Sequence, residues 1–212
     1  MRGRSVLPHL GLPAQPTLRG SSMDMEKIKG RLDFLREAEK LKDVLRSAHT
    51  ASGRTESTAE HSWRLCLMAM VFADQLPGLD LLKILKMCVI HDLGEAIHGD
   101  VPAVNQVAFP NKGEQERRDL LLLAQSLDSP LKAEILALWD DYENALSPEA
   151  KAVKAMDKLE TLLQHTQGLN PPDFDYAFNL AYGKKHTDAQ PLFEALRALI
   201  DQATEQRLHA AE

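Results

Sequence analysis

The sequence has few cysteines, no long apolar run and no excess of positive charge. Cys66 and Cys88 are its only cysteines, and because they form no CxxC or CxxxC pair, neither a disulfide framework nor a thiolate zinc site is expected. No apolar run approaches the roughly 18 residues of a membrane-spanning helix. The net charge of −6 disfavours nucleic acid and anionic membranes as partners, because both attract basic surfaces. We therefore expect a soluble, cytoplasmic protein with reduced, buried thiols.

The N-terminal stretch lacks helical and strand periodicity. Pro8, Pro13 and Pro16 interrupt it, and it contains no continuous apolar segment of the kind found in secretory signals. We interpret residues 1–23 as a disordered tail. A chain of 212 residues, 44% of them hydrophobic, can close one sizeable core, so we predict a single domain over residues 24–209.

Helical patterns dominate the remaining sequence. Apolar residues spaced by three and four predict a first helix over residues 24–45. Ser57 and Glu60 match the S-x-x-E capping box, which predicts a second helix over residues 57–75. A third helix, over residues 80–90, is apolar on nearly every side, and we expect it in the middle of a bundle.

The same N-terminal capping motif occurs twice in the second half of the chain. Ser129-Pro130 and Ser147-Pro148 each place an N-cap serine before a proline at the first helical position. A last amphipathic stretch covers residues 190–208. No segment shows sustained strict alternation and no repeat has a fixed period, so we predict an all-α bundle of six or seven helices.

The predicted helix over residues 80–90 ends in charged residues that need partners. His91 and Asp92 follow it, and Glu95 falls on the same helix face, three and four residues further on. Imidazole and carboxylate together suit a borderline or hard divalent cation such as Mn, Co, Fe, Ni, Mg or Zn. Such a cation lowers the pKa of a bound water and offsets charge on a phosphoryl oxygen, so the pattern favours phosphate-ester hydrolysis.

Three motifs carry a resemblance to a known family. His61 in A-E-H-S-W, His91-Asp92 in H-D-L-G-E-A and Asp157 in K-A-M-D-K-L-E resemble the H…HD…D pattern of the HD superfamily of metal-dependent phosphohydrolases. The segments R-T-E-S-T-A-E-H-S, H-D-L-G-E-A-I-H-G-D-V-P-A and E-I-L-A-L-W-D-D-Y-E look like the subgroup of 5′-deoxynucleotidases and HD domain-containing protein 2. The resemblance covers residues 41–165 and implies an HD-domain helical bundle.

This resemblance implies a role for each matching acid and histidine. Glu95 and Asp100 match acidic positions that act in catalysis or hold a second cation, and the carbonyl of Val101 is a further candidate ligand for that cation. Four residues match the ligands of the first metal ion: His61, His91, Asp92 and Asp157.

Three further positions bear on the substrate. Arg54 matches a basic residue that lies close to the phosphate in the deoxynucleotidases, and Arg46 also matches the subgroup. By ungapped counting back from His61, Ser47 stands where those enzymes carry a tryptophan that helps to exclude ribonucleotides. Selectivity for deoxyribose is therefore an open question, and His49 is another residue that could supply it.

The function implied is hydrolysis of a nucleoside 5′-monophosphate to nucleoside and phosphate by a homodimeric enzyme. The same cation would serve a cyclic-nucleotide phosphodiesterase or a nucleoside triphosphate hydrolase, so the ligand set leaves these alternatives open. A non-catalytic metal-binding or nucleotide-binding module is a third alternative. The presence of Glu95 and Asp100 argues against it, because a decayed site would have no reason to keep acids beyond the ligands.

Overall fold

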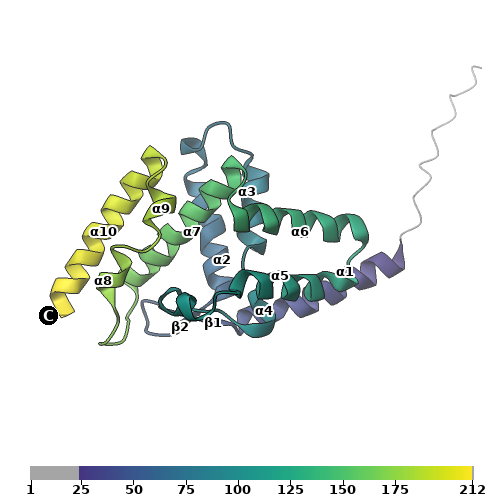
Figure 1. Cartoon of the computed structure of the whole chain (residues 1–212), viewed down its shortest axis with the longest axis horizontal. Coiled ribbons are helices and arrows are strands. Elements are labelled where there is room, and N and C mark those ends of the chain that lie inside the picture. Colours follow the sequence, from purple (N-terminus) through teal and green to yellow (C-terminus); the bar gives the residue numbers. More distant parts are fainter. Residues whose placement is uncertain (1–23, 212) are drawn as a thin grey trace, which may run out of the picture.

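The computed structural model describes residues 24–211, and within them helices make up nearly all of the fold (Figure 1). Seven helices have ten residues or more, which agrees with the predicted all-α bundle, and single turns of α-helix and 3₁₀-helix (η) connect them. The tail predicted for residues 1–23 lies outside the described residues. The elements in chain order are α1 (Met25–Ala38), η1 (Glu39–Lys42), β1 (Leu45–His49), β2 (Thr55–Ser57), α2 (Thr58–Val71), η2 (Ala73–Gln75), α3 (Leu81–Ile90), α4 (Glu95–His98), η3 (Ala103–Ala108), α5 (Lys112–Leu123), η4 (Ala124–Ser126), α6 (Ser129–Asn144), α7 (Pro148–Gln167), α8 (Tyr176–Asn179), α9 (Lys184–Thr187) and α10 (Pro191–Ala211).

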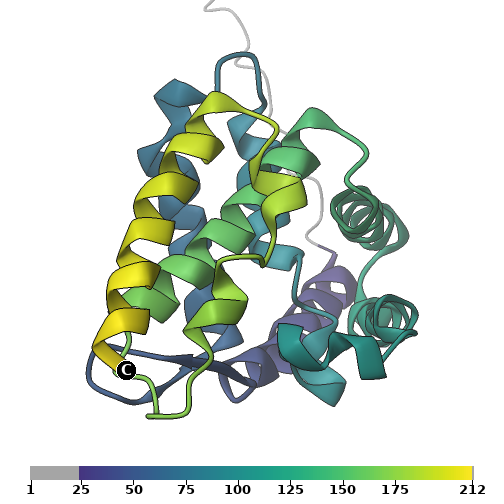
Figure 2. The same ribbon diagram turned by 60° about the vertical axis from the view of Figure 1, so that its left-hand side comes forward.

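Helix α7, not α3, occupies the middle of the molecule. It packs against α2, α3, α6, α9 and α10, and Figure 2 shows it between α10 and the helices behind it. The side chains of Val153, Met156 and Leu159 are fully buried there. The prediction that residues 80–90 form the central helix was wrong, because Leu82 and Val89 of α3 are more than half exposed. Apolar composition alone did not distinguish a surrounded helix from one with an open apolar face.

The core divides into two clusters of buried side chains. The central core joins α2, α3, α7 and α10 and contains Leu65, Met87 and Met156. The side core joins η1, α4, α5 and α6 and contains Leu120 and Trp139. The end of α3 passes from one cluster into the other, which places the segment that follows it at their junction.

A small β-hairpin replaces the end of the predicted first helix. Helix α1 ends at Ala38, and Leu45 begins β1, which pairs antiparallel with β2. Gly53, with φ of +85°, turns the chain between the strands, a conformation that glycine adopts without strain. The strands have five and three residues, too short for sustained alternation to reveal them in the sequence. The hairpin matters for the site because β1 carries Arg46 and Ser47.

The predicted helix starts are mostly confirmed. Ser57 and Glu60 form the capping box of α2, and Ser147 caps α7 by accepting a hydrogen bond from the N–H of Ala150 at 3.1 Å. The predicted N-cap at Ser129 was wrong by one residue, because Asp128 is the N-cap and Ser129 is already helical. None of the helices within residues 24–211 is both long and apolar enough to cross a membrane.

Candidate metal centre and active site

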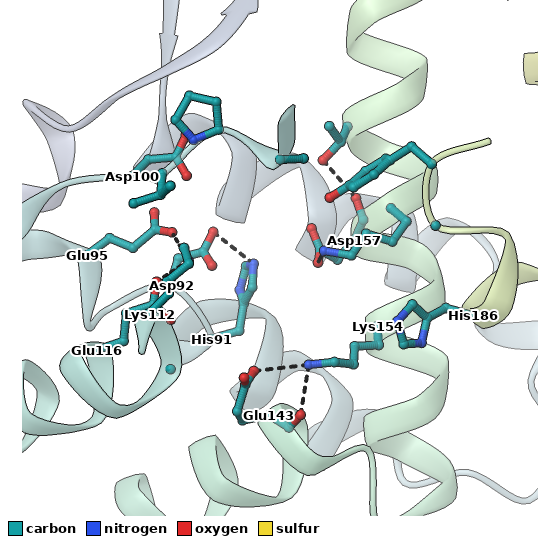
Figure 3. Close-up of a pocket in the computed structure, with 18 of the residues that line it drawn as sticks. His91, Asp92, Glu95, Asp100, Lys112, Glu116, Glu143, Lys154, Asp157 and His186 are labelled. Atoms are coloured by element: carbon teal, nitrogen blue, oxygen red, sulfur yellow. Dashed lines mark hydrogen bonds and ion pairs between the residues drawn. The ribbon is translucent and has the colours of Figure 1, made fainter. Parts of the chain in front are cut away.

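A cavity of about 690 Å³ lies at the junction of the two cores. Its walls come from β1, the segment after α3, the start of α5, the end of α6, α7 and the region around α9. Figure 3 shows His91, Asp92 and Glu95 on one side of this cavity and Asp157 and Lys154 on the other. The cavity therefore brings together residues that the sequence separates by more than sixty positions.

Three of the four predicted ligands form a tight group at the cavity floor. Candidate ligand atoms of His61, His91 and Asp92 all lie within 4.8 Å of one another. The Nε2 atoms of both histidines are buried and have no hydrogen-bond partner, although buried polar atoms almost always have one. Asp92 Oδ2 lies 3.0 Å from His91 Nε2 and 3.9 Å from His61 Nε2. A divalent cation would satisfy both nitrogens, so the donor set fits the predicted metal.

Asp157 joins this group from α7. Its Oδ1 lies 3.2 Å from His61 Nε2, but Asp157 is outside the group of atoms within 4.8 Å of one another. Its Oδ2 accepts hydrogen bonds from the hydroxyl of Tyr142 at 2.7 Å and from Lys158 Nζ at 2.9 Å. One carboxylate oxygen is thus fixed by its neighbours, and the other faces the histidine pair.

Backbone contacts fix the orientation of His91 at the end of α3. Its Nδ1 lies 2.9 Å from the carbonyl oxygen of Cys88, a contact in which the protonated nitrogen donates. Trp139 Nε1 donates to the carbonyl oxygen of His91 at 3.0 Å. A proton on Nδ1 leaves the lone pair of Nε2 free for a cation, which is the arrangement common to metal-binding histidines.

The electric field at the cavity floor favours positive charge. Burial and the neighbouring Arg46 disfavour protonation of His61, but Glu160 and Asp157 outweigh them and raise its pKa to about 9. Burial likewise disfavours the ionised form of Asp92, yet His91 and His61 hold the pKa of this carboxyl below its usual value. The carboxylates around the histidines therefore attract a cation.

Glu95 and Asp100 stand beside the ligand group on the other wall. Glu95, on the single turn α4, is 3% exposed, and Thr58 Oγ1 lies 3.4 Å from its Oε2. Burial, followed by the charges of Asp92 and Asp100, raises the pKa of Glu95 to about 9. Burial also raises the pKa of Asp100. Val101 lines the same wall.

The predicted substrate residues fall into two places. Arg46 and Ser47 line the cavity, and Arg46 Nη2 donates to Thr161 Oγ1 at 2.9 Å while its Nη1 lies 3.7 Å from Asp92. Arg54 does not line it. Its guanidinium binds both carboxylate oxygens of Glu60, at 2.7 and 3.0 Å, beside a separate shallow hollow. The structure does not bring Arg54 to the other site residues.

Several site residues were missed in the sequence. Lys112, at the start of α5, contacts Glu116 and lies 3.2 Å from Glu95 Oε1, and no motif distinguishes it from other lysines. Tyr142 stands in the segment E-I-L-A-L-W-D-D-Y-E, but that segment does not indicate that its hydroxyl reaches Asp157. Glu160 left a signal, because its position three residues after Asp157 puts both carboxylates on one side of α7.

Comparisons with known proteins agree with this geometry. A profile of the HD domain matches residues 38–197. The 5′-deoxynucleotidase HDDC2 of Xenopus laevis is 30% identical over 175 residues, which cover 79% of this chain and 86% of the relative. The human protein of the same name is 33% identical over 138 residues, which cover 64% of this chain and 67% of the relative.

Solved structures show the same fold. A protein from Magnetospirillum magnetotacticum MS-1, described as a predicted metal-dependent phosphohydrolase, superposes with a TM-score of 0.75 at 28% identity, covering 85% of this chain and 94% of that chain. A conserved hypothetical protein from Pyrococcus furiosus superposes with a TM-score of 0.57 at 27% identity, covering 82% and 99%. The profile match spans most of the chain and includes every predicted ligand, and we conclude that this chain belongs to the HD domain family.

Proposed function

We propose that this chain is a divalent-metal-dependent 5′-nucleotidase, which hydrolyses nucleoside 5′-monophosphates to nucleoside and phosphate. The observation that carries the proposal is the pair of buried, unpartnered Nε2 atoms of His61 and His91 among carboxylates at the floor of a cavity. The cavity volume of about 690 Å³ falls within the range of roughly 300–1,000 Å³ typical of small-molecule sites. The related deoxynucleotidases support the choice of substrate.

The cation would be held by His61, His91, Asp92 and Asp157. Mixed nitrogen and oxygen ligands suit Mn, Co, Fe, Ni, Mg or Zn, and the ligand types do not select one of them. When bound there, a divalent cation supplies charge that activates water and stabilises phosphoryl oxygens. Glu95, Asp100 and the Val101 carbonyl are the candidate ligands for a second cation.

We assign proton transfer to Glu95 and Asp100. Water adds to phosphorus, the bond between phosphorus and the nucleoside 5′-oxygen breaks, and a proton moves from the water to one of these carboxylates and then to the departing oxygen. Burial raises the pKa of Glu95 to about 9, although Lys112 opposes this rise, so the carboxyl is protonated near neutral pH when no cation is bound. A bound cation beside Glu95 would lower this pKa toward neutrality, and the carboxylate could then accept a proton and return it.

Arg46 is the residue best placed to hold the phosphate. Its guanidinium lines the cavity and is held by Thr161 through Nη2, while its Nε lies 3.4 Å from Glu56 Oε2. A guanidinium at a cavity wall can bind phosphate oxygens through charge-assisted hydrogen bonds. Ser47 lies next to it and is placed to meet the sugar.

A phosphate-release screen tests this function. The protein is stripped with a chelator, and Mn²⁺, Co²⁺ or Mg²⁺ is added singly with each ribonucleoside and deoxyribonucleoside 5′-monophosphate, with cyclic nucleotides and triphosphates as competitors. We expect metal-dependent release from the 5′-monophosphates. Faster turnover of a cyclic nucleotide or a triphosphate would replace the proposal with one of those activities, and the absence of turnover with every pair would favour a binding module.

We also propose that the enzyme is a homodimer. Trp63, Leu67, Met70 and Val71 lie at i, i+4, i+7 and i+8 on α2 and are all exposed, which gives this helix an apolar stripe opposite the metal ligand it carries. A second copy would remove this stripe from water. Light scattering on the purified chain checks the assembly, and a monomeric mass for the wild type would rule it out.

A further inference from the structure

A second group of buried ligand-type side chains lies behind the cavity floor. Glu56, His61 and Glu160 have candidate ligand atoms within 4.8 Å of one another, and all three residues are buried. His61 therefore stands between two acidic groups: its Nε2 faces Asp92 and Asp157, and its Nδ1 contacts Glu160. We call Glu56, His61 and Glu160 the rear group. Its contacts with Nδ1 determine whether Nε2 of His61 is available to bind a cation.

An arginine holds Glu160 in place from the opposite side. Arg64 Nε donates to Glu160 Oε1 at 2.6 Å, and Arg64 Nη2 donates to the Glu160 backbone carbonyl at 3.3 Å. The other carboxylate oxygen, Oε2, accepts from His61 Nδ1. Neither His61 nor Glu160 is exposed to solvent, so this chain of contacts is protected from competing water.

The rear group does not need a cation of its own. Arg64 contacts the Glu160 carboxylate, and Arg46 Nε lies 3.4 Å from Glu56 Oε2. Each buried carboxylate thus already has a guanidinium beside it. A metal ion between them would bring further positive charge next to two largely buried guanidinium groups, with side chains 12% and 21% exposed, which Coulomb repulsion opposes.

We propose that Glu160, held by Arg64, is a positioning residue of the metal centre. It keeps the proton of His61 on Nδ1, and Nε2 therefore faces the cavity as a ligand atom. The inference rests on the metal site of the proposed function.

The spacing of residues along α2 and α7 supports the distinction between metal ligands and the residues that position them. His61 and Arg64 are three residues apart on α2, and Asp157 and Glu160 are three residues apart on α7. Because residues three apart share a helix face, each helix presents one predicted ligand and one supporting residue to the other. The two helices pack directly against each other.

Glu160→Gln is the most informative variant, because glutamine has nearly the same shape but only one acceptor oxygen. If Arg64 takes that oxygen, the amide N–H₂ faces His61 and favours the ring form protonated on Nε2, which cannot bind a metal. We expect cobalt affinity to fall about 10- to 100-fold, the usual effect of losing the outer partner of a metal-bound histidine. Glu160→Ala should lose a similar amount.

Removing Arg64 as well should restore binding in part. In the double variant Glu160→Gln, Arg64→Gln, the amide oxygen of residue 160 is free to accept from His61 Nδ1. We expect this double variant to bind cobalt about tenfold more tightly than Glu160→Gln alone, because residues in one hydrogen-bond network have strongly non-additive effects. A merely structural role for Glu160 predicts further loss instead.

The experiment titrates Co²⁺ into chelator-treated full-length protein, with calorimetry for affinity and the visible Co²⁺ absorption spectrum for coordination. Circular dichroism checks that every variant is folded. The matched control is Glu134→Gln, which removes a carboxylate from an exposed ion pair with Lys86 and should change affinity by no more than about twofold. The variant His61→Ala gives the Co²⁺ affinity of a site that lacks this histidine ligand.

The outcomes separate the two proposals. Weakened, spectrally altered Co²⁺ binding in Glu160→Gln with recovery in the double variant supports the positioning role. Wild-type affinity in folded Glu160→Gln, or a double variant that binds no better than Glu160→Gln, overturns it. If His61→Ala binds Co²⁺ as tightly as the wild type, it is the metal site of the proposed function that fails.

Discussion

The two walls of the cavity are built differently. On one wall, Asp157 of α7 lines the cavity and the buried His61 of α2 lies beside it, on helices of 20 and 14 residues that pack into the central core. On the other wall, Glu95 belongs to the four-residue turn α4, and Lys112 at the start of α5 lies 3.2 Å from its Oε1. The first wall carries two predicted ligands on long helices, and the second carries the predicted proton-transfer groups together with the other two ligands, His91 and Asp92.

Because of this difference, we expect that a substitution can remove proton transfer without removing cation binding. Ligands on packed helices keep their geometry when a neighbouring loop changes, because the central core holds them. Glu95 depends on contacts from Thr58, Lys112 and its own short turn. Substitutions on the two walls are therefore expected to have different effects. Two substitutions test this expectation, and two more compare the walls with the hairpin that carries Ser47 and precedes α2.

The largest effect is expected for Asp157→Ala, on the helical wall. Removing this carboxylate should abolish both metal binding and hydrolysis while the protein stays helical, because the change removes a charged ligand and little packing volume. Metal analysis by mass spectrometry and circular dichroism check both halves. Asp140→Asn, which breaks an exposed pair with Arg117, is the control. Full metal occupancy in Asp157→Ala would remove this residue from the site.

Glu95→Ala, on the opposite wall, should divide the two functions. We expect at least one cation to remain bound while turnover falls by about 10²- to 10⁴-fold, the range associated with losing a general base or acid. The comparison is with Glu114→Gln, a substitution on the exposed face of α5. Near-normal kcat in Glu95→Ala would refute its catalytic role, and loss of all metal would mean that the walls are not separable.

A smaller effect is expected at Ser47, where β1 meets the cavity. Serine leaves room for a ribose 2′-hydroxyl, so ribonucleoside and deoxyribonucleoside monophosphates should be hydrolysed with comparable kcat/KM. Ser47→Trp should then disfavour the ribonucleotide by roughly 10- to 200-fold, as a filled pocket does with one small group. A strong deoxyribose preference in the wild type would contradict this and direct attention to His49.

Arg54→Ala should have the smallest effect. Arg54 is exposed, binds Glu60 and does not line the cavity, so we expect kcat/KM for a nucleoside monophosphate to change by less than about threefold, as for substitutions away from a site. Arg46→Ala, measured beside it, should cost far more, because that guanidinium does line the cavity. A large loss in Arg54→Ala would show that the hairpin moves toward the substrate.

The sequence predicted the metal ligands and the two acids better than the side chains that support them, for a physical reason. His61, His91 and Asp157 lie in helical segments whose periodicity and caps are local properties, and their motifs are compact. Lys112 and Tyr142 reach the site through contacts between different elements, 17 and 15 residues away in sequence, and such contacts leave no local pattern. The central position of α7 was missed similarly, because burial depends on which neighbours a helix finds.

The central claim is tested most directly by the position of the cation itself. Crystals soaked in Mn²⁺ are measured on both sides of the manganese absorption edge, and the anomalous difference map locates the ion. The account predicts a peak in contact with Nε2 of His61 and His91 and with the carboxylates of Asp92 and Asp157. A peak among Glu56, His61 Nδ1 and Glu160, or no peak at the cavity floor with manganese bound elsewhere, would contradict it.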